Sequence, residues 1–113
     1  MVKYPSVHST FHALSDPTRQ AIVERLARVG DEPISSLAAG HRMSLPGFLK
    51  HVRLLERAGL VTTEKTGRVR RCRLAPKALD EAQVWIQTHR AFWNAQMDSL
   101  DRYLVSTPPA EEP

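Results

Sequence analysis

The basic side chains of this sequence are concentrated in one segment, and the chemistry open to them is the binding of anions. Between His41 and Ala75 there are nine Lys or Arg residues and two acids, whereas the rest of the sequence carries a slight excess of acids. A localised positive field attracts an anionic polymer. Charge alone does not exclude the alternative that these residues form an ordinary solvent-exposed face with no binding role. The nine residues are Arg42, Lys50, Arg53, Arg57, Lys65, Arg68, Arg70, Arg71 and Arg73.

The first half of this segment is predicted to form a helix over 44–58. Ser44 is a suitable capping residue, and Pro46 falls in the first turn, where proline is tolerated. A shorter helix is expected over Ile34 to Ala39, and the turn over Gly40 to Ser44 separates the two. Two helices joined in this way, the second one basic, match a helix-turn-helix. The apolar side of the helix over 44–58 consists of Leu49, Val52, Leu54 and Leu55. Lys50, Arg53 and Arg57 project away from that side.

The second half of the segment is predicted to form a hairpin. Strands are expected over Leu60 to Lys65 and Val69 to Leu74, with Gly67 supplying the unusual turn conformation. Upstream, a helix is expected from Pro17 to Val29 and a turn over Asp31 to Pro33. The predicted fold class is therefore mainly α with a small β-hairpin: a winged helix-turn-helix of about five helices and a two-stranded wing.

A long aromatic helix is predicted from near Pro76 to about Leu104. Its apolar residues recur every three or four positions, and they give it more apolar surface than so small a domain can cover alone. We expect this helix to form a dimer interface with a first helix predicted around Val7 to Leu14, although an ordinary core helix is the alternative. The predicted interface residues are Phe11, Trp85, His89, Phe92, Trp93, Leu100 and Leu104, with Leu14 beside Phe11.

The 113 residues are expected to form one domain. An arm is predicted over 1–9, the winged-helix and dimerisation domain over 10–104, and a disordered tail over 105–113. The sequence has no apolar run long enough to span a membrane and no signal-like core near its start, so a cytoplasmic location is expected. An enzyme is the weakest class, because there is no glycine-rich phosphate loop and no plausible catalytic arrangement.

The potential metal ligands are sparse. The short helix over 34–39 contains no thiol, and His8 and His12 are the only histidines with ligand-like spacing. No metal and no cofactor are predicted, and His89 is expected to be a packed or hydrogen-bonded interface residue. Cys72 lies between two arginines, which would favour a reactive thiolate if it were exposed. Strand alternation places it on the side of Leu74 instead, which favours a buried, inert thiol.

The sequence from Phe11 to Leu104 resembles the ArsR family of bacterial winged-helix transcriptional repressors. Residues 11–19 read FHALSDPTR, similar to the family's ALSDPTRR, and residues 54–61 read LLERAGLV, similar to its VLERAGLV. Ile34 to Ala39 stands where the family has a short helix. The strand over 68–74 and the Phe92-Trp93 pair further resemble a metal-independent branch. The resemblance implies a homodimeric repressor that binds an inverted repeat in double-stranded DNA.

In that arrangement the helix over 44–58 enters the major groove, with its N-terminal end nearest the base edges. Lys50, His51 and Arg53 would then lie at phosphates or groove walls. Arg68, Arg70 and Arg71 would reach the flanking backbone or the minor groove. The expected reading positions are Ser44, Leu45, Pro46, Gly47 and Phe48.

The sequence departs from the family where Leu49 stands, because many relatives carry a serine there that contacts DNA. Leu49 cannot donate a hydrogen bond, so fewer direct hydrogen bonds to the bases are expected. Phe48 is expected either to meet a thymine methyl group or to pack in the core. The alternative function is a winged helix that binds an acidic protein partner. Whether a small-molecule inducer exists is left open.

Overall fold

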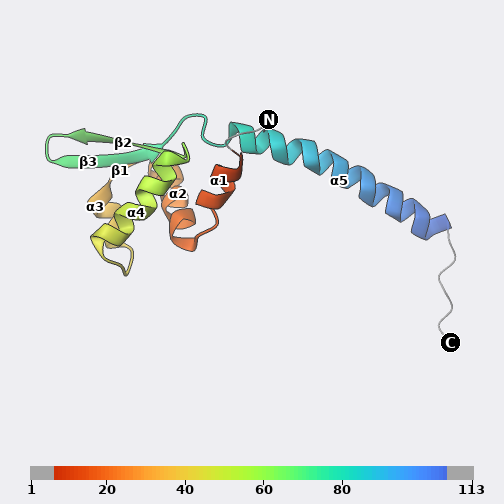
Figure 1. Cartoon of the computed structure of the whole chain (residues 1–113), viewed down its shortest axis with the longest axis horizontal. Helices are drawn as coiled ribbons and strands as arrows, with labels where there is room; N and C mark the ends of the chain where they lie inside the picture. Colours follow the sequence, from red (N-terminus) through yellow and green to blue (C-terminus); the bar gives the residue numbers. More distant parts are fainter. Residues whose placement is uncertain (1–6, 107–113) are drawn as a thin grey trace. The chain divides into compact units, whose positions relative to one another are not determined.

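The computed structural model describes residues 7–106, and the helices and the sheet are shown in Figure 1. The chain divides into two compact units that meet inside the last helix, one ending at Ala82 and the other beginning at Gln83. Residues 1–6 of the predicted arm and 107–113 of the predicted tail lie outside the described residues. Val105 and Ser106, which the tail prediction included, belong to the last helix. Val7 to Ser9, which the arm prediction included, already belong to the first helix.

Two helices precede the basic segment, and capping residues set their bounds. Helix α1 spans Val7–Ala13 and α2 spans Pro17–Val29. The Asp16 side chain accepts a hydrogen bond from the Arg19 backbone N–H at 3.0 Å, and Pro17 follows it. Gly30 ends α2 with φ of 85°, a conformation that glycine adopts easily, and its N–H bonds the Leu26 carbonyl. The predicted bounds of α2 are confirmed.

The helix-turn-helix consists of α3, Ile34–Ala39, and α4, Leu45–Arg57. Ser44 caps α4, because its Oγ accepts a hydrogen bond from the Gly47 N–H at 3.2 Å. Beyond the C-terminal end, Gly59 has φ of 80° and turns the chain into the wing. Both helices and the turn between them match the prediction.

The sheet has three antiparallel strands where two were predicted. Strand β2 spans Val61–Thr66, β3 spans Val69–Leu74 and β1 spans Asp31–Pro33, in the order β1-β3-β2. The prediction of a turn over Asp31 to Pro33 was wrong, because these three residues pair with Arg71, Cys72 and Arg73 of β3. Gly67, with φ of 63°, begins the tight turn between β2 and β3.

The core of the winged-helix unit lies between α2, α3, α4 and the base of the sheet. Phe48 is completely buried in it, so the core alternative for this residue is confirmed. Cys72 is also buried, as strand alternation predicted, and burial raises the pKa of its thiol to about 11, with Glu56 and Asp31 acting in the same direction. Other core residues are Ile22, Leu26, Ile34, Leu37, Val52, Leu55, Leu60 and Val61.

Helix α5 spans Asp80–Ser106, so it begins four residues after the predicted start at Pro76. It carries an unusual number of exposed apolar side chains, including Phe92 and Trp93 at 61% and 65% exposure. In the part of the chain that the structure describes, no helix is long and apolar enough to cross a membrane.

Candidate nucleic-acid interface

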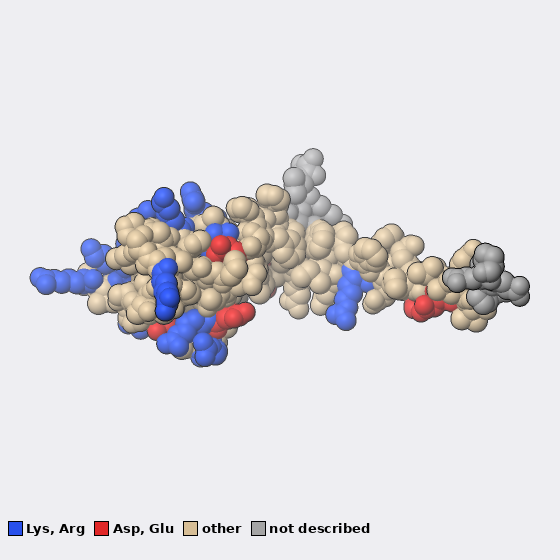
Figure 2. Space-filling model, turned by 90° about the horizontal axis from the view of Figure 1, so that it is seen from below, with Lys and Arg blue, Asp and Glu red and all other residues tan. Residues whose placement is uncertain are grey.

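Helix α4 presents a row of cations on the side away from the core. Its buried residues are Phe48, Val52 and Leu55, whereas Lys50, Arg53 and Arg57 are exposed. None of these three cations forms a salt bridge with another described residue. Their charges are therefore available to phosphates. In Figure 2 the Lys and Arg side chains gather over the winged-helix unit, while α5 shows few of them.

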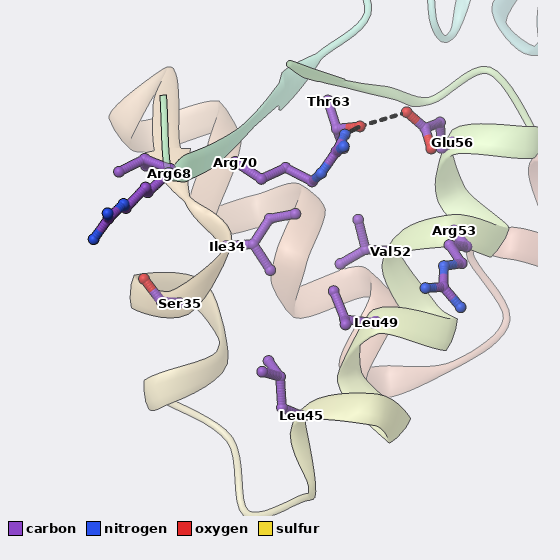
Figure 3. Close-up of a pocket in the computed structure, with 11 residues that line it drawn as sticks. Ile34, Ser35, Leu45, Leu49, Val52, Arg53, Glu56, Thr63, Arg68 and Arg70 are labelled. Atoms are coloured by element: carbon purple, nitrogen blue, oxygen red, sulfur yellow. Dashed lines mark hydrogen bonds between the residues drawn. The ribbon is translucent and has the colours of Figure 1, made fainter. Parts of the chain in front are cut away.

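The wing directs Arg70 toward α4. The Arg70 guanidinium donates to Thr63 Oγ1 at 3.0 Å, and the Thr63 hydroxyl donates to a carboxylate oxygen of Glu56 at 2.7 Å (Figure 3). Glu56 lies in α4, so a chain of two hydrogen bonds joins α4 to the wing. This chain holds Arg70 in place while its remaining N–H groups can still donate.

Arg71 lies on the opposite face of the sheet from Arg70, since side chains alternate along a strand. Its Nε donates to Asp31 Oδ1 at 2.6 Å, and this ion pair joins β3 to β1. Arg73 shares that face and lies 3.7 Å from Glu64. Arg71 was predicted to contact DNA, but the structure gives it an acid partner and places it away from α4.

His51 faces α2 rather than the exposed side of α4. Arg19 Nη1 lies 3.0 Å from His51 Nδ1, and Asp16 Oδ2 lies 3.8 Å from the same nitrogen. A guanidinium can only donate, so in the neutral ring Nδ1 accepts and the proton is on Nε2. That leaves the Nε2–H to meet a phosphate. The hydrogen bond that the Arg19 backbone N–H donates to the Asp16 carboxylate lowers the pKa of Asp16.

A groove of about 580 Å³ lies between α3, α4 and the wing. Its apolar part comes from Leu45 and Leu49 of α4 together with neighbouring core residues, and its basic part comes from Arg68 and Arg70 (Figure 3). Beside α4, the groove thus has an apolar wall with cations at its border. The lining residues are Ile34, Ser35, Leu45, Leu49, Val52, Arg53, Glu56, Thr63, Arg68, Val69 and Arg70.

The residues predicted for a dimer interface are distributed over α1 and α5. On α5, the His89 ring stacks on Trp85 with centroids 4.1 Å apart, and its Nδ1 lies 2.8 Å from the Trp85 carbonyl oxygen. His89 is thus hydrogen-bonded, as expected. Phe11 on α1 is partly exposed. The α5 residues Phe92, Trp93, Leu100 and Leu104 are all exposed.

The His8 and His12 rings lie parallel, with centroids 6.4 Å apart. Among residues 7–106, no three His, Cys, Asp or Glu side chains come together as a metal site would require.

Two arrangements at this surface escaped sequence reasoning: the Glu56–Thr63–Arg70 chain and the Arg19–His51 contact. The first links three residues of neighbouring elements at seven-residue intervals, and the second joins residues 32 positions apart. A signal for the first was available, because Thr63 and Arg70 lie on facing strands of a predicted hairpin.

A short helix, a capped basic helix and a β2–β3 wing within a three-stranded sheet define a winged helix-turn-helix domain of the DNA-binding class. The comparisons with known proteins agree. Residues 14–64 match a family model described as a helix-turn-helix domain. The HTH-type transcriptional regulator Rv2034 of Mycobacterium tuberculosis is 38% identical over 79 residues, which cover 70% of this chain and 73% of that protein.

Solved structures give the family. The ArsR family transcriptional regulator RHA00566 is 38% identical with a TM-score of 0.76, covering 83% of this chain and 97% of that one. Mb0332 of Mycobacterium bovis, a homodimeric winged helix-turn-helix DNA-binding domain, shares the fold at 23% identity, a TM-score of 0.61 and coverage of 78% and 82%. The chain belongs to the ArsR family of winged-helix, DNA-binding transcriptional regulators, and it is not an enzyme.

Proposed function

We propose that this chain is a homodimeric repressor that binds an inverted-repeat operator through α4 and the wing, without a sensing metal. The observation that carries the proposal is the set of exposed cations on α4, Lys50, Arg53 and Arg57, beside the groove-facing Arg68 and Arg70. Cations without acid partners can neutralise phosphates, which dominate the affinity of such complexes.

Within this proposal the contacts have separate roles. Ser44, Leu45, Pro46 and Gly47 face the base edges, because the N-terminal end of a recognition helix reaches deepest into the groove. Lys50, Arg53, Arg68 and Arg70 bind phosphates. His51 donates to one phosphate through Nε2–H. Arg71 is withdrawn from the set of contacts, since Asp31 neutralises it on the other face of the sheet.

Dimerisation is proposed because α5 exposes large aromatic side chains that water solvates poorly. The shared fold of the homodimeric Mb0332 domain is consistent with it. Metal independence is proposed because α3 lacks cysteine and the His8–His12 pair has no third ligand among the described residues.

The test is a titration against the DNA upstream of the protein's own gene and against a random duplex, at 50 and 200 mM salt. If a dimer makes roughly six to ten phosphate contacts, affinity should fall by about 10³ to 10⁵ between these concentrations. Tight binding to the upstream DNA alone, unchanged by a chelator or by added zinc, is expected. Salt-insensitive or sequence-indifferent binding would contradict the proposal and direct attention to an acidic protein partner.

A reporter gene placed behind the bound DNA tests repression itself. Expression should rise when the regulator is deleted and fall when it is restored. An activator would give the opposite response while leaving the binding data unchanged.

A further inference from the structure

The opening of α4 carries no hydrogen-bonding side chain. Residues 45–49 read Leu-Pro-Gly-Phe-Leu, and the Oγ of Ser44 before them already accepts the Gly47 N–H. The first polar side chain within the helix is that of Lys50. A recognition helix usually distinguishes base pairs by side-chain hydrogen bonds from this end, so the reading must rest on another kind of contact here.

Two of these apolar side chains are positioned to make that contact. Phe48 is buried, whereas Leu45 is 53% exposed and Leu49 is half-buried. They are four residues apart, so they share one side of α4. Both lie along the groove beside the wing (Figure 3). The pair therefore forms a continuous apolar strip at the reading end of the helix.

Cations border this strip on both sides. Lys50 and Arg53 project from α4, and Arg68 and Arg70 extend from the wing. The complementary partner is thus a surface that has apolar groups between two rows of negative charge. The major groove of DNA has this pattern, and its apolar group is the C5 methyl of thymine.

We propose that Leu45 and Leu49 read thymine methyl groups, so that the operator half-site requires T·A pairs facing the start of α4. This inference rests on the proposed function, that of a sequence-specific DNA-binding protein. It assigns to two leucines the discrimination that hydrogen-bonding side chains provide elsewhere. Burying one methyl group in such a contact corresponds to about a fourfold gain in affinity.

The experiment begins by selecting binding sites from a pool of random duplexes. Each thymine of the selected half-site is then replaced, one at a time, by deoxyuridine, which removes the methyl group and keeps base pairing. At the thymines that face α4, we expect affinity to fall about fourfold. Replacing such a T·A pair by 5-methylcytosine·G should cost less than replacing it by C·G, because the first keeps the methyl group.

Two protein variants link the methyl group to the leucines. In L45A and L49A, the deoxyuridine penalty should disappear at the thymine that the missing side chain contacted. Leu49 also packs against the core, so the exposed Leu45 supplies the variant less at risk of unfolding. The matched control is K50A, which should bind both duplexes more weakly and keep the deoxyuridine penalty unchanged.

Each outcome decides the matter. A penalty that disappears in the leucine variants and persists in K50A supports the inference. Sequence-specific binding without a deoxyuridine penalty, or with the same penalty in L45A and L49A, overturns the inference and leaves the proposed function standing. If no sequence is enriched from the random pool, the proposed function itself fails.

Discussion

Two neighbouring arginines of β3 make different contacts. Arg70 and Arg71 are adjacent in sequence, but one faces α4 through Thr63 and the other pairs with Asp31 on the opposite face. Sequence analysis put both at the DNA, because charge counting does not distinguish the faces. Alternation along the strand could have separated them, since Cys72 marks the buried side.

The pair supplies a matched comparison, because each alanine variant removes one positive charge from the same strand. R70A should weaken DNA binding on all sequences and reduce the salt slope by about one. R71A should leave the slope nearly unchanged. The measurement is the affinity for one duplex over a series of salt concentrations. Equal slopes for R70A and R71A would contradict the placement of Arg70 at a phosphate.

Cys72 permits a prediction about pH, because burial raises the pKa of its thiol from 9.0 to about 11. The folded state therefore binds this proton more tightly than the unfolded state. The resulting stability is fully present below pH 9 and is lost as pH rises toward 11. Chemical unfolding of wild type and C72A across this range should show a steeper loss for wild type. Rapid thiol labelling of the native protein at pH 8 would contradict a buried thiol.

At the scale of elements, local signals determined most of the fold. Asp16-Pro17 and Ser44 mark helix starts and Gly30 and Gly59 mark helix ends, so the predicted helices agree with the observed ones to within a few residues. Strand β1 could not be found in this way. Its sequence, Asp-Glu-Pro, has the composition of a turn, and only the edge of β3 and the ion pairs of Asp31 and Glu32 make it a strand.

The site was predictable as a surface but not in its details. The helix and hairpin that carry the cations could be read from spacing. The direction of His51 depended on a tertiary contact, because the Arg19 guanidinium of α2 engages its ring. Contacts between distant segments leave no periodic trace in a sequence.

The cap of α4 can be separated from its contact with DNA. S44A removes the acceptor for the Gly47 N–H and should cost about 1 kcal/mol, which lowers the melting temperature by roughly 4–8 °C. S44D keeps the cap, so it should melt near the wild-type temperature. Its carboxylate should nevertheless repel phosphates and weaken DNA binding. Thermal unfolding and a DNA titration of both variants provide the check, and normal DNA affinity for S44D would place Ser44 away from the duplex.

At the scale of the whole molecule, the exposed apolar residues of α5 predict assembly. Placing a charge among them, as in W93E, should produce a monomer, because burying an unpaired carboxylate at an apolar interface is costly. Light scattering after gel filtration measures the change. The matched control is Q87E, which adds the same charge at a polar position of α5. A W93E variant that remains dimeric would show that Trp93 lies outside the interface.

Operator binding should fall together with dimerisation. A monomer contacts one half-site, so W93E should lose most of its affinity for the full inverted repeat while retaining weak, salt-dependent binding.

The pairing of β1 with β3 has a consequence for how the regulator acquires its ability to read DNA. Asp31 and Arg71, 40 residues apart, close a loop that contains α3, α4 and β2. The entropy of closing that loop is lost in one step, and afterwards the recognition helix and the wing share a single base. We therefore expect α4 and the wing to fold and unfold together. A chain in which β1 and β3 have not paired is accordingly expected to lack the DNA-binding surface altogether, rather than to present part of it.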